Sequence, residues 1–348
     1  MVGADWSASN RSNGAGQLVT MQNGLIGLGS GAASALLFAS LTSGSYLSIG
    51  LFYLAPLPLM IAGLGWSHWS ALIGAAAGSA LLAAMFGLTF FVGFVAVVGA
   101  PSWWLTRLAM LAWPVPAGEN AGPSEQVEWF PPGMLVVWCA LLGAALVLLA
   151  FPLFGLDTAS FHAGLTRMIT QMLHIETGTP SGQPLNVPGI ENVPRMVDVL
   201  ATIVPPAAAV LATLINLINL WLAARVVKFS SRLMRPWPQL SAMTFPVWLV
   251  LLLAAAVGVT FAGGLAAIAA TVVAASLTVA YAVLGFAVLH EITRGLDSRP
   301  FVLGGVYASV LVFGWPMLLL FLLGLTETAA HIRARVAARR TASPKRPT

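Results

Sequence analysis

The sequence predicts an all-α protein, a polytopic transmembrane helical bundle of about eight spans, within a range of seven to nine. Of its 348 residues, 58% are hydrophobic and 8% are charged, whereas soluble domains carry about 25% charged residues. Its mean hydropathy is +0.89. No Asp, Glu, Lys or Arg occurs between Arg11 and Arg107. Since one crossing needs about 20 apolar residues, this stretch holds several crossings.

The pattern within these segments favours helices over membrane-spanning β-strands. Barrel strands alternate polar and apolar residues, but these segments are apolar on all sides. The helix is then the spanning structure that satisfies its own backbone hydrogen bonds.

Nine hydrophobic segments approach the length of one crossing. They are 23–42, 46–65, 69–86, 88–105, 132–153, 200–227, 245–262, 265–290 and 303–324. The weakest are the fourth, interrupted at Pro101, and the last, interrupted at Trp315-Pro316. We favour eight complete spans with both termini in the cytoplasm.

The basic residues leave a conflict in this topology. Positive residues mark the cytoplasmic ends of spans, and they gather after the sixth segment and in the C-terminal tail. They are Arg225, Lys228, Arg232 and Arg235, then Arg333, Arg335, Arg339 and Arg340. If the last three segments all cross, the two groups lie on opposite sides. Either the charge rule fails at one of them, or one segment does not cross completely.

The chain divides by composition into a bundle with two polar ends. The parts are a polar N-terminal segment at 1–22, the bundle at 23–328 and a basic tail at 329–348. An insertion at about 154–199 begins with apolar residues at helical spacing and continues as a loop rich in Pro and Gly. Those apolar residues are Phe161, Leu165, Met168 and Met172. They predict an amphipathic helix on the membrane surface.

Several function classes find no support in the residues. The net charge of +5 comes from the basic tail, which favours a membrane topology signal over nucleic-acid binding. Cys139 is the only cysteine, so no intramolecular disulfide and no cysteine metal cluster can form. The five histidines show no HExxH motif, and no Walker or GxSxG motif occurs. We therefore expect no enzyme, no metal site and no cofactor.

The sixth segment carries a polar face. Thr213, Asn216 and Asn219 recur at every third position, so they lie along one side of the helix. Carboxamides in hydrocarbon need partners, so this side faces the bundle or a wet cavity. It either binds a polar solute or makes hydrogen bonds between helices. Both interpretations remain open.

The second segment contains two prolines in mid-span, Pro56 and Pro58. Proline removes a backbone donor and clashes with the preceding turn. Interrupted helices hold the substrate in many transporters, but neighbouring helices also repair such kinks. Both interpretations fit the sequence.

These features together resemble the YybS-like family of bacterial multi-pass membrane proteins. The resemblance is carried by Leu54-Ala55-Pro56-Leu57-Pro58-Leu59, Ala62-Gly63-Leu64-Gly65, Asn216, Asn219, Arg225 and the terminal Leu323-Gly324-Leu325 before an arginine-rich tail. That family is distantly similar to the substrate-binding membrane components of energy-coupling-factor vitamin transporters. The resemblance implies a small-molecule-binding bundle in the bacterial inner membrane that works with partner proteins. The 154–199 insertion departs from a compact six-helix component.

We therefore predict a transporter-like membrane component of the bacterial inner membrane that binds a small solute. Its ligand-binding candidates are Thr213, Asn216, Asn219, Pro56 and Pro58. Expected partners are membrane lipids, membrane or ATPase proteins and a small-molecule ligand, with no nucleic acid. The alternative is a membrane scaffold or assembly factor that acts through protein partners.

Overall fold

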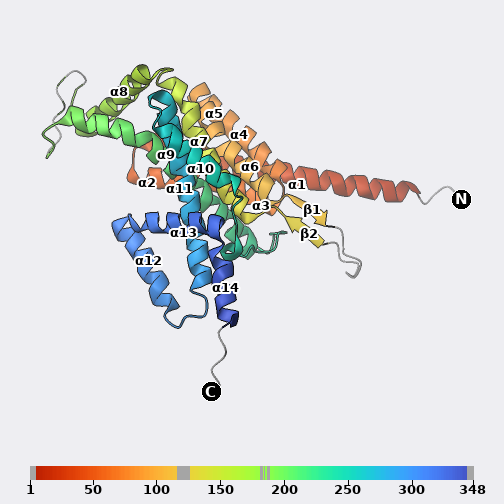
Figure 1. Ribbon diagram of the computed structural model, residues 1–348. Helices are drawn as coiled ribbons and strands as arrows, with labels where there is room; N and C mark the ends of the chain where they lie inside the picture. The colour runs from red at the N-terminus through yellow and green to blue at the C-terminus, as the bar shows by residue number, and fades with distance from the viewer. Residues whose placement is uncertain (1–4, 116–125, 181–182, 184, 186–188, 343–348) are drawn as a thin grey trace. The chain divides into compact units, whose positions relative to one another are not determined.

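The computed structural model describes residues 5–115, 126–180, 183, 185 and 189–342 (Figure 1). Their contacts divide the chain into two compact units. The first unit is Met1–Leu135 with Ile215–Pro238, and the second is Val136–Leu214 with Gln239–Thr348. Two helices, α7 (Pro132–Ala150) and α9 (Val193–Phe229), pass from one unit to the other.

The first unit consists of helices and a short hairpin besides its shares of α7 and α9. Its elements are α1 (Asp5–Ala39), α2 (Tyr46–Tyr53), α3 (Pro56–Gly65), α4 (His68–Phe86), α5 (Leu88–Phe94), α6 (Ala100–Ala109), β1 (Ala112–Val115) and β2 (Gln126–Trp129). The two strands are antiparallel, with Ala112 opposite Trp129. The hairpin lies between α6 and α7 in the chain.

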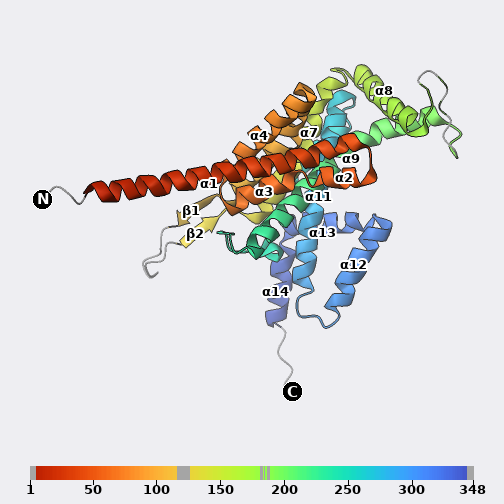
Figure 2. The ribbon, with the colours of Figure 1, turned by 180° about the vertical axis from the view of Figure 1, so that it is seen from behind.

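Glycines set the closest helix contact of the first unit, between α1 and α4. A Cβ on Gly31 would lie 2.3 Å from the carbonyl oxygen of Gly74, and one on Gly27 would lie 2.8 Å from that of Ser70. The two helices therefore touch through their backbones and run in the same direction, side by side in Figure 2. Small residues at a helix interface permit this approach in membranes.

The fourth segment is helical throughout, although Pro101 interrupts its pattern. A π-helical turn, Val95–Gly99, joins α5 to α6. Pro101 has no N–H to give to the preceding turn, and the N–H of Ala100 reaches back five residues to Val95 O. The expected interruption is thus absorbed by a π-bulge, a common device inside helices.

The second unit contains the rest of α7 and α9 and six further helices. These are α8 (Thr158–Thr177), α10 (Trp248–Thr260), α11 (Gly264–Ile292), α12 (Arg299–Phe313), α13 (Pro316–Ala330) and α14 (Ile332–Ala342). The amphipathic helix expected in the insertion is α8, and it buries Phe161, Leu165 and Ile169. Asp157 caps its N-terminus by accepting from the backbone N–H groups of Ala159 and Ser160.

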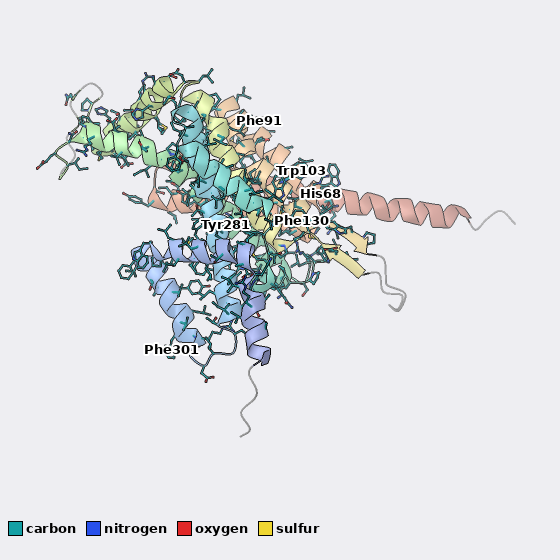
Figure 3. All side chains as sticks on the ribbon, in the orientation of Figure 1. His68, Phe91, Trp103, Phe130, Tyr281 and Phe301 are labelled. Atoms are coloured by element: carbon teal, nitrogen blue, oxygen red, sulfur yellow. The ribbon has the colours of Figure 1, made fainter. Side chains whose placement is uncertain are left out.

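Helices α11 and α13 make the closest contact of the second unit. A Cβ on Gly285 would lie 1.9 Å from Leu320 O, and one on Gly324 would lie 2.0 Å from Tyr281 O. In contrast, α12 buries none of its side chains. Phe301 on α12 is 84% exposed and points away from its neighbours (Figure 3).

The last hydrophobic segment of the sequence is divided in the structure. Gly314 has φ +70°, a conformation that costs glycine little, and Pro316 then begins α13. The halves are 15 residues each, shorter than one crossing.

Seven segments of the described chain are long and apolar enough to cross a membrane. They are Met21–Ser43, Tyr46–Gly65, His68–Phe86, Leu88–Ala109, Pro132–Leu153, Val193–Phe229 and Gly264–Ile292. Helix α10 is apolar but has 13 residues. The all-α multi-pass fold class is therefore confirmed.

The α1–α4 contact gives a matched pair of glycine substitutions. Gly31→Ala should destabilise the protein by about 1–3 kcal/mol, because the new methyl group overpacks a backbone contact. Gly29→Ala on the same helix meets nothing within 4 Å, and alanine favours the helix. Thermal unfolding in detergent should therefore rank Gly31→Ala below wild type and Gly29→Ala at or above it. Equal effects would contradict the backbone contact.

Candidate functional site

The two mid-span prolines shift the hydrogen bonds of the second span. Pro56 and Pro58 cannot donate to the carbonyls four residues before them, those of Phe52 and Leu54. These carbonyls instead accept from the N–H groups of Ala55, at 3.0 Å, and Leu57, at 3.0 Å. The shift ends α2 and begins α3. It also turns the Leu57 N–H away from Tyr53 O, its usual acceptor in a helix.

Asn219 of α9 supplies the donor that Tyr53 lacks. Its Nδ2 donates to Tyr53 O at 2.8 Å and to Ile215 O, one turn earlier in its own helix, at 2.8 Å. The sequence pointed separately to the polar face of α9 and to the proline break. The structure brings them together at this hydrogen bond. The amide nitrogen repairs the interrupted backbone, as neighbouring helices do in membranes.

The other end of the same amide has no partner in the structure. Asn219 is 1% exposed, and its Oδ1 is buried and accepts no hydrogen bond. Asn216, 4% exposed, lies one turn earlier on the same face. A buried acceptor without a donor costs about 1–3 kcal/mol. Asn219 Oδ1 is therefore an unpaired acceptor on the predicted polar face.

Thr213 makes a different contact from the two asparagines. Its hydroxyl donates to Ala209 O at 2.8 Å. It also packs on Gly143 of α7, where a Cβ would lie 2.4 Å from Oγ1. This contact belongs to the second unit, whereas Asn216 and Asn219 belong to the first. Thr213 thus serves helix packing within its own unit.

Arg235 is buried rather than exposed, unlike its basic neighbours. The side chain is 8% exposed, donates from Nη1 to Ala109 O at 3.1 Å and from Nη2 to Phe130 O at 2.7 Å. These carbonyls lie at the end of α6 and just after β2, so one guanidinium joins both ends of the hairpin. Burial lowers the pKa of Arg235, but a guanidinium remains charged in proteins.

Arg333 has a similar role in the second unit. Its Nε donates to Glu327 Oε1 at 2.8 Å, and its backbone N–H donates to Oε2 at 3.0 Å. Its remaining guanidinium nitrogens donate to Ser241 O and Met243 O. The start of α14 is thereby tied to the segment that precedes α10.

The other basic candidates are exposed. Arg225, Lys228 and Arg232 each lie over an indole ring, within 4.5–5.8 Å of its centroid. Arg335 is exposed on α14. The side chains of Arg339 and Arg340 lie outside the described residues.

An open groove of about 760 Å³ lies between α8 and the start of α9. Its polar lining includes His162, Thr166, Arg167 and Asp198. The sequence did not indicate this groove, because Asp198 of α9 lies far along the chain from the α8 residues that it meets there. No group of three or more His, Cys, Asp or Glu in the described part of the chain is placed to hold a metal ion.

Known proteins add no identification. Neither the protein-family models, nor the curated proteins, nor the solved structures contain a match to this chain. The resemblance to the YybS-like family stays a prediction.

The buried guanidinium of Arg235 predicts a specific loss of stability. Arg235→Met should lower the free energy of unfolding by about 1.5–3 kcal/mol, since two carbonyls lose a charged donor. Arg235→Lys should recover only part, because an ammonium lacks the fork that reaches both carbonyls. The exposed Arg225→Met is the control, expected to change stability by about 1 kcal/mol or less, since it loses only exposed cation–π contacts. Denaturation in detergent measures all three, and equal losses at 225 and 235 would contradict the assignment.

Proposed function

We propose that this chain is a transporter-like membrane protein that binds a small solute among the helices of its first unit. One observation carries the proposal: Asn219 Oδ1 is buried, lacks a donor and lies beside the interruption between α2 and α3. Interrupted helices in transporters expose backbone and side-chain groups that hold the substrate.

The unpartnered atom is an acceptor, and this defines the solute's chemistry. A solute with a hydroxyl or amide N–H would satisfy Oδ1, and the buried Asn216 would offer further polar contacts. No Asp, Glu, Lys or Arg lies between positions 199 and 224 of α9, so a full charge on the solute would find no counter-charge along this stretch. In this proposal the chain binds a neutral or weakly charged solute without transforming it.

We also propose eight crossings with both termini in the cytoplasm of a bacterium, in its inner membrane. Arg333 bonds to Ser241 and Met243, which follow directly after the basic segment 225–235. This contact supports one common side for that basic segment and the tail. The topology conflict then disappears if the whole apolar segment 245–262, which contains α10, crosses and α12 and α13 remain on the cytoplasmic side, where the positive charges belong.

The alternative proposal, a membrane scaffold, draws on the same Arg333 contacts. Four hydrogen bonds of Arg333 fix the N-terminal end of the basic helix α14. A tail without a binding partner would not require such a fixed orientation. Partner proteins, including an ATPase in the transporter case, would be recognised through this helix. Loss of partners on removing residues 335–348, with solute binding intact, would favour the scaffold.

Asn219 tests the solute proposal because its structural and binding roles can be separated. Asn219→Leu should remove any small molecule that co-purifies with the protein and lower stability, since Tyr53 O loses its donor. Pro58→Ala restores the N–H for Leu54 O and frees Leu57 to bond Tyr53 O. In that background Asn219→Leu should cost less stability while the small molecule stays absent.

The measurements are mass spectrometry of small molecules released from the purified protein and thermal unfolding of the same samples. Asn216→Leu should weaken retention without affecting Tyr53. An unchanged small-molecule spectrum in the Asn219→Leu protein would overturn the solute site. Recovery of the solute when Pro58→Ala is added would also overturn it, because the asparagine would then act on the backbone alone.

The topology is open to a cysteine test, because the single native cysteine is buried. Cysteines at Ser231, Ser298 and Thr341 should all be shielded from a membrane-impermeant maleimide in intact cells and react after the membrane is opened. Ser43 lies just after the C-terminal end of α1, on the opposite side of the membrane from both termini in this arrangement. A cysteine at Ser43 should therefore react in intact cells. Labelling of Thr341→Cys in intact cells would contradict the eight-span arrangement.

A further inference from the structure

The basic residues at one end of the first unit form a cluster with tryptophans. Arg232 lies 4.5 Å from the ring centroid of Trp66, and Lys228 lies 4.5 Å from that of Trp237. Arg225 also lies over Trp237, at 5.6 Å. We call Arg225, Lys228, Arg232, Trp66 and Trp237 the basic–indole cluster.

Helix packing brings these residues together at one end of the first unit. The end of α3 meets α9, since a Cβ on Gly65 would lie 3.5 Å from Val227. The end of α6 meets the loop after α9, since Arg235 bonds to Ala109 O. The carboxyl ends of α3, α6 and α9 therefore converge. Figure 3 labels Trp103 of α6 and His68, which follows α3, in the same region.

Among the residues that the structure describes, none of the three exposed cations has a carboxylate partner. The described ion pairs join Arg294 to Glu291 and Arg333 to Glu327, and both lie in the second unit. The cations of the basic–indole cluster rest on aromatic faces instead, which leaves their N–H groups available. A cation–π contact is worth about 0.5–1 kcal/mol at exposed sites and does not neutralise the charge.

The indoles add unpaired donors to this positive region. The Nε1 atoms of Trp66 and of Trp103 are buried and have no hydrogen-bond acceptor. Indole nitrogen only donates, so each needs an acceptor that the described chain does not supply. Guanidinium, ammonium and indole N–H groups all match phosphate oxygens.

Exposed apolar residues next to the cations distinguish a lipid from a soluble anion. Trp221 is 49% exposed, Val226 43% and Phe229 94%, on the same turns of α9 as Arg225 and Lys228. Free phosphate would leave this apolar surface uncovered, whereas a phospholipid would cover it with acyl chains. Basic pockets at the ends of spanning helices suit anionic headgroups.

We propose that the basic–indole cluster binds the headgroup phosphate of an anionic phospholipid. Arg232 and Lys228 contact the phosphate, Arg225 adds charge, and the indole N–H of Trp66 donates to a phosphate oxygen. The exposed side of α9 receives the acyl chains. This lipid site is independent of the solute proposed at Asn219.

The experiment measures lipid retention by native mass spectrometry of the full-length protein purified in mild detergent. Phosphatidylglycerol is added in one arm, phosphatidylcholine in a second and inorganic phosphate in a third. Wild type should retain phosphatidylglycerol at least fivefold over phosphatidylcholine. Lys228→Gln/Arg232→Gln should reduce that preference to about onefold, and Trp66→Phe should reduce it while keeping the aromatic face.

Arg335→Gln is the matched control, because it removes an exposed cation from the second unit and should leave the preference unchanged. A preference that survives in the Lys228→Gln/Arg232→Gln protein would overturn the site. Inorganic phosphate at millimolar concentration that displaces phosphatidylglycerol would overturn the lipid as its occupant. Thermal unfolding of each variant, which should stay within a few degrees of wild type, shows that altered retention does not come from misfolding.

Discussion

The structure depends on one constraint, the need of each backbone carbonyl for a donor where water is absent. A regular helix meets this need by itself, and seven segments of the described chain are helical, apolar and long enough to cross a membrane. Where a helix breaks or ends, a carbonyl loses its partner and a side chain must provide one. In a chain with 8% charged residues, few charged side chains are available, and Arg235 and Arg333 both serve this purpose.

Three side chains donate to backbone carbonyls in this way, those of Asn219, Arg235 and Arg333. Asn219 bonds to the carbonyl left open by Pro56 and Pro58, Arg235 bonds to the end of α6 and the residue after β2, and Arg333 bonds to two carbonyls before α10. Each long-range bond joins segments that are far apart in the sequence. These polar groups thus help to hold the tertiary structure, and Asn219 Oδ1 is among the buried side-chain atoms that remain without a partner.

Basic residues of similar appearance in the sequence divide into two kinds in the structure. Arg235 turns inward to carbonyls, while Arg225, Lys228 and Arg232 remain exposed over indoles. From the sequence, all of them are expected to mark the cytoplasmic ends of spans. The positions of the basic residues along the chain do not show which guanidinium lies within reach of two carbonyl groups. That distinction requires the fold, because Ala109 and Phe130 are more than a hundred residues from Arg235.

The sequence alone determined the medium and the helical form of the apolar segments, since long uncharged apolar runs have one stable form in lipid, but it did not indicate the strands β1 and β2. It also located the polar face of α9, the proline interruption of the second span, the weakness at Trp315-Pro316 and the helix in the insertion, because these are local patterns. It did not determine that Pro101 would be absorbed by a π-turn, that Asn219 would meet Tyr53, or that Arg333 would bind beside Ser241 and Met243. Those outcomes depend on which helices pack together. Packing between apolar helices follows glycine contacts and backbone partners distributed over the whole chain, so only the tertiary structure decides them.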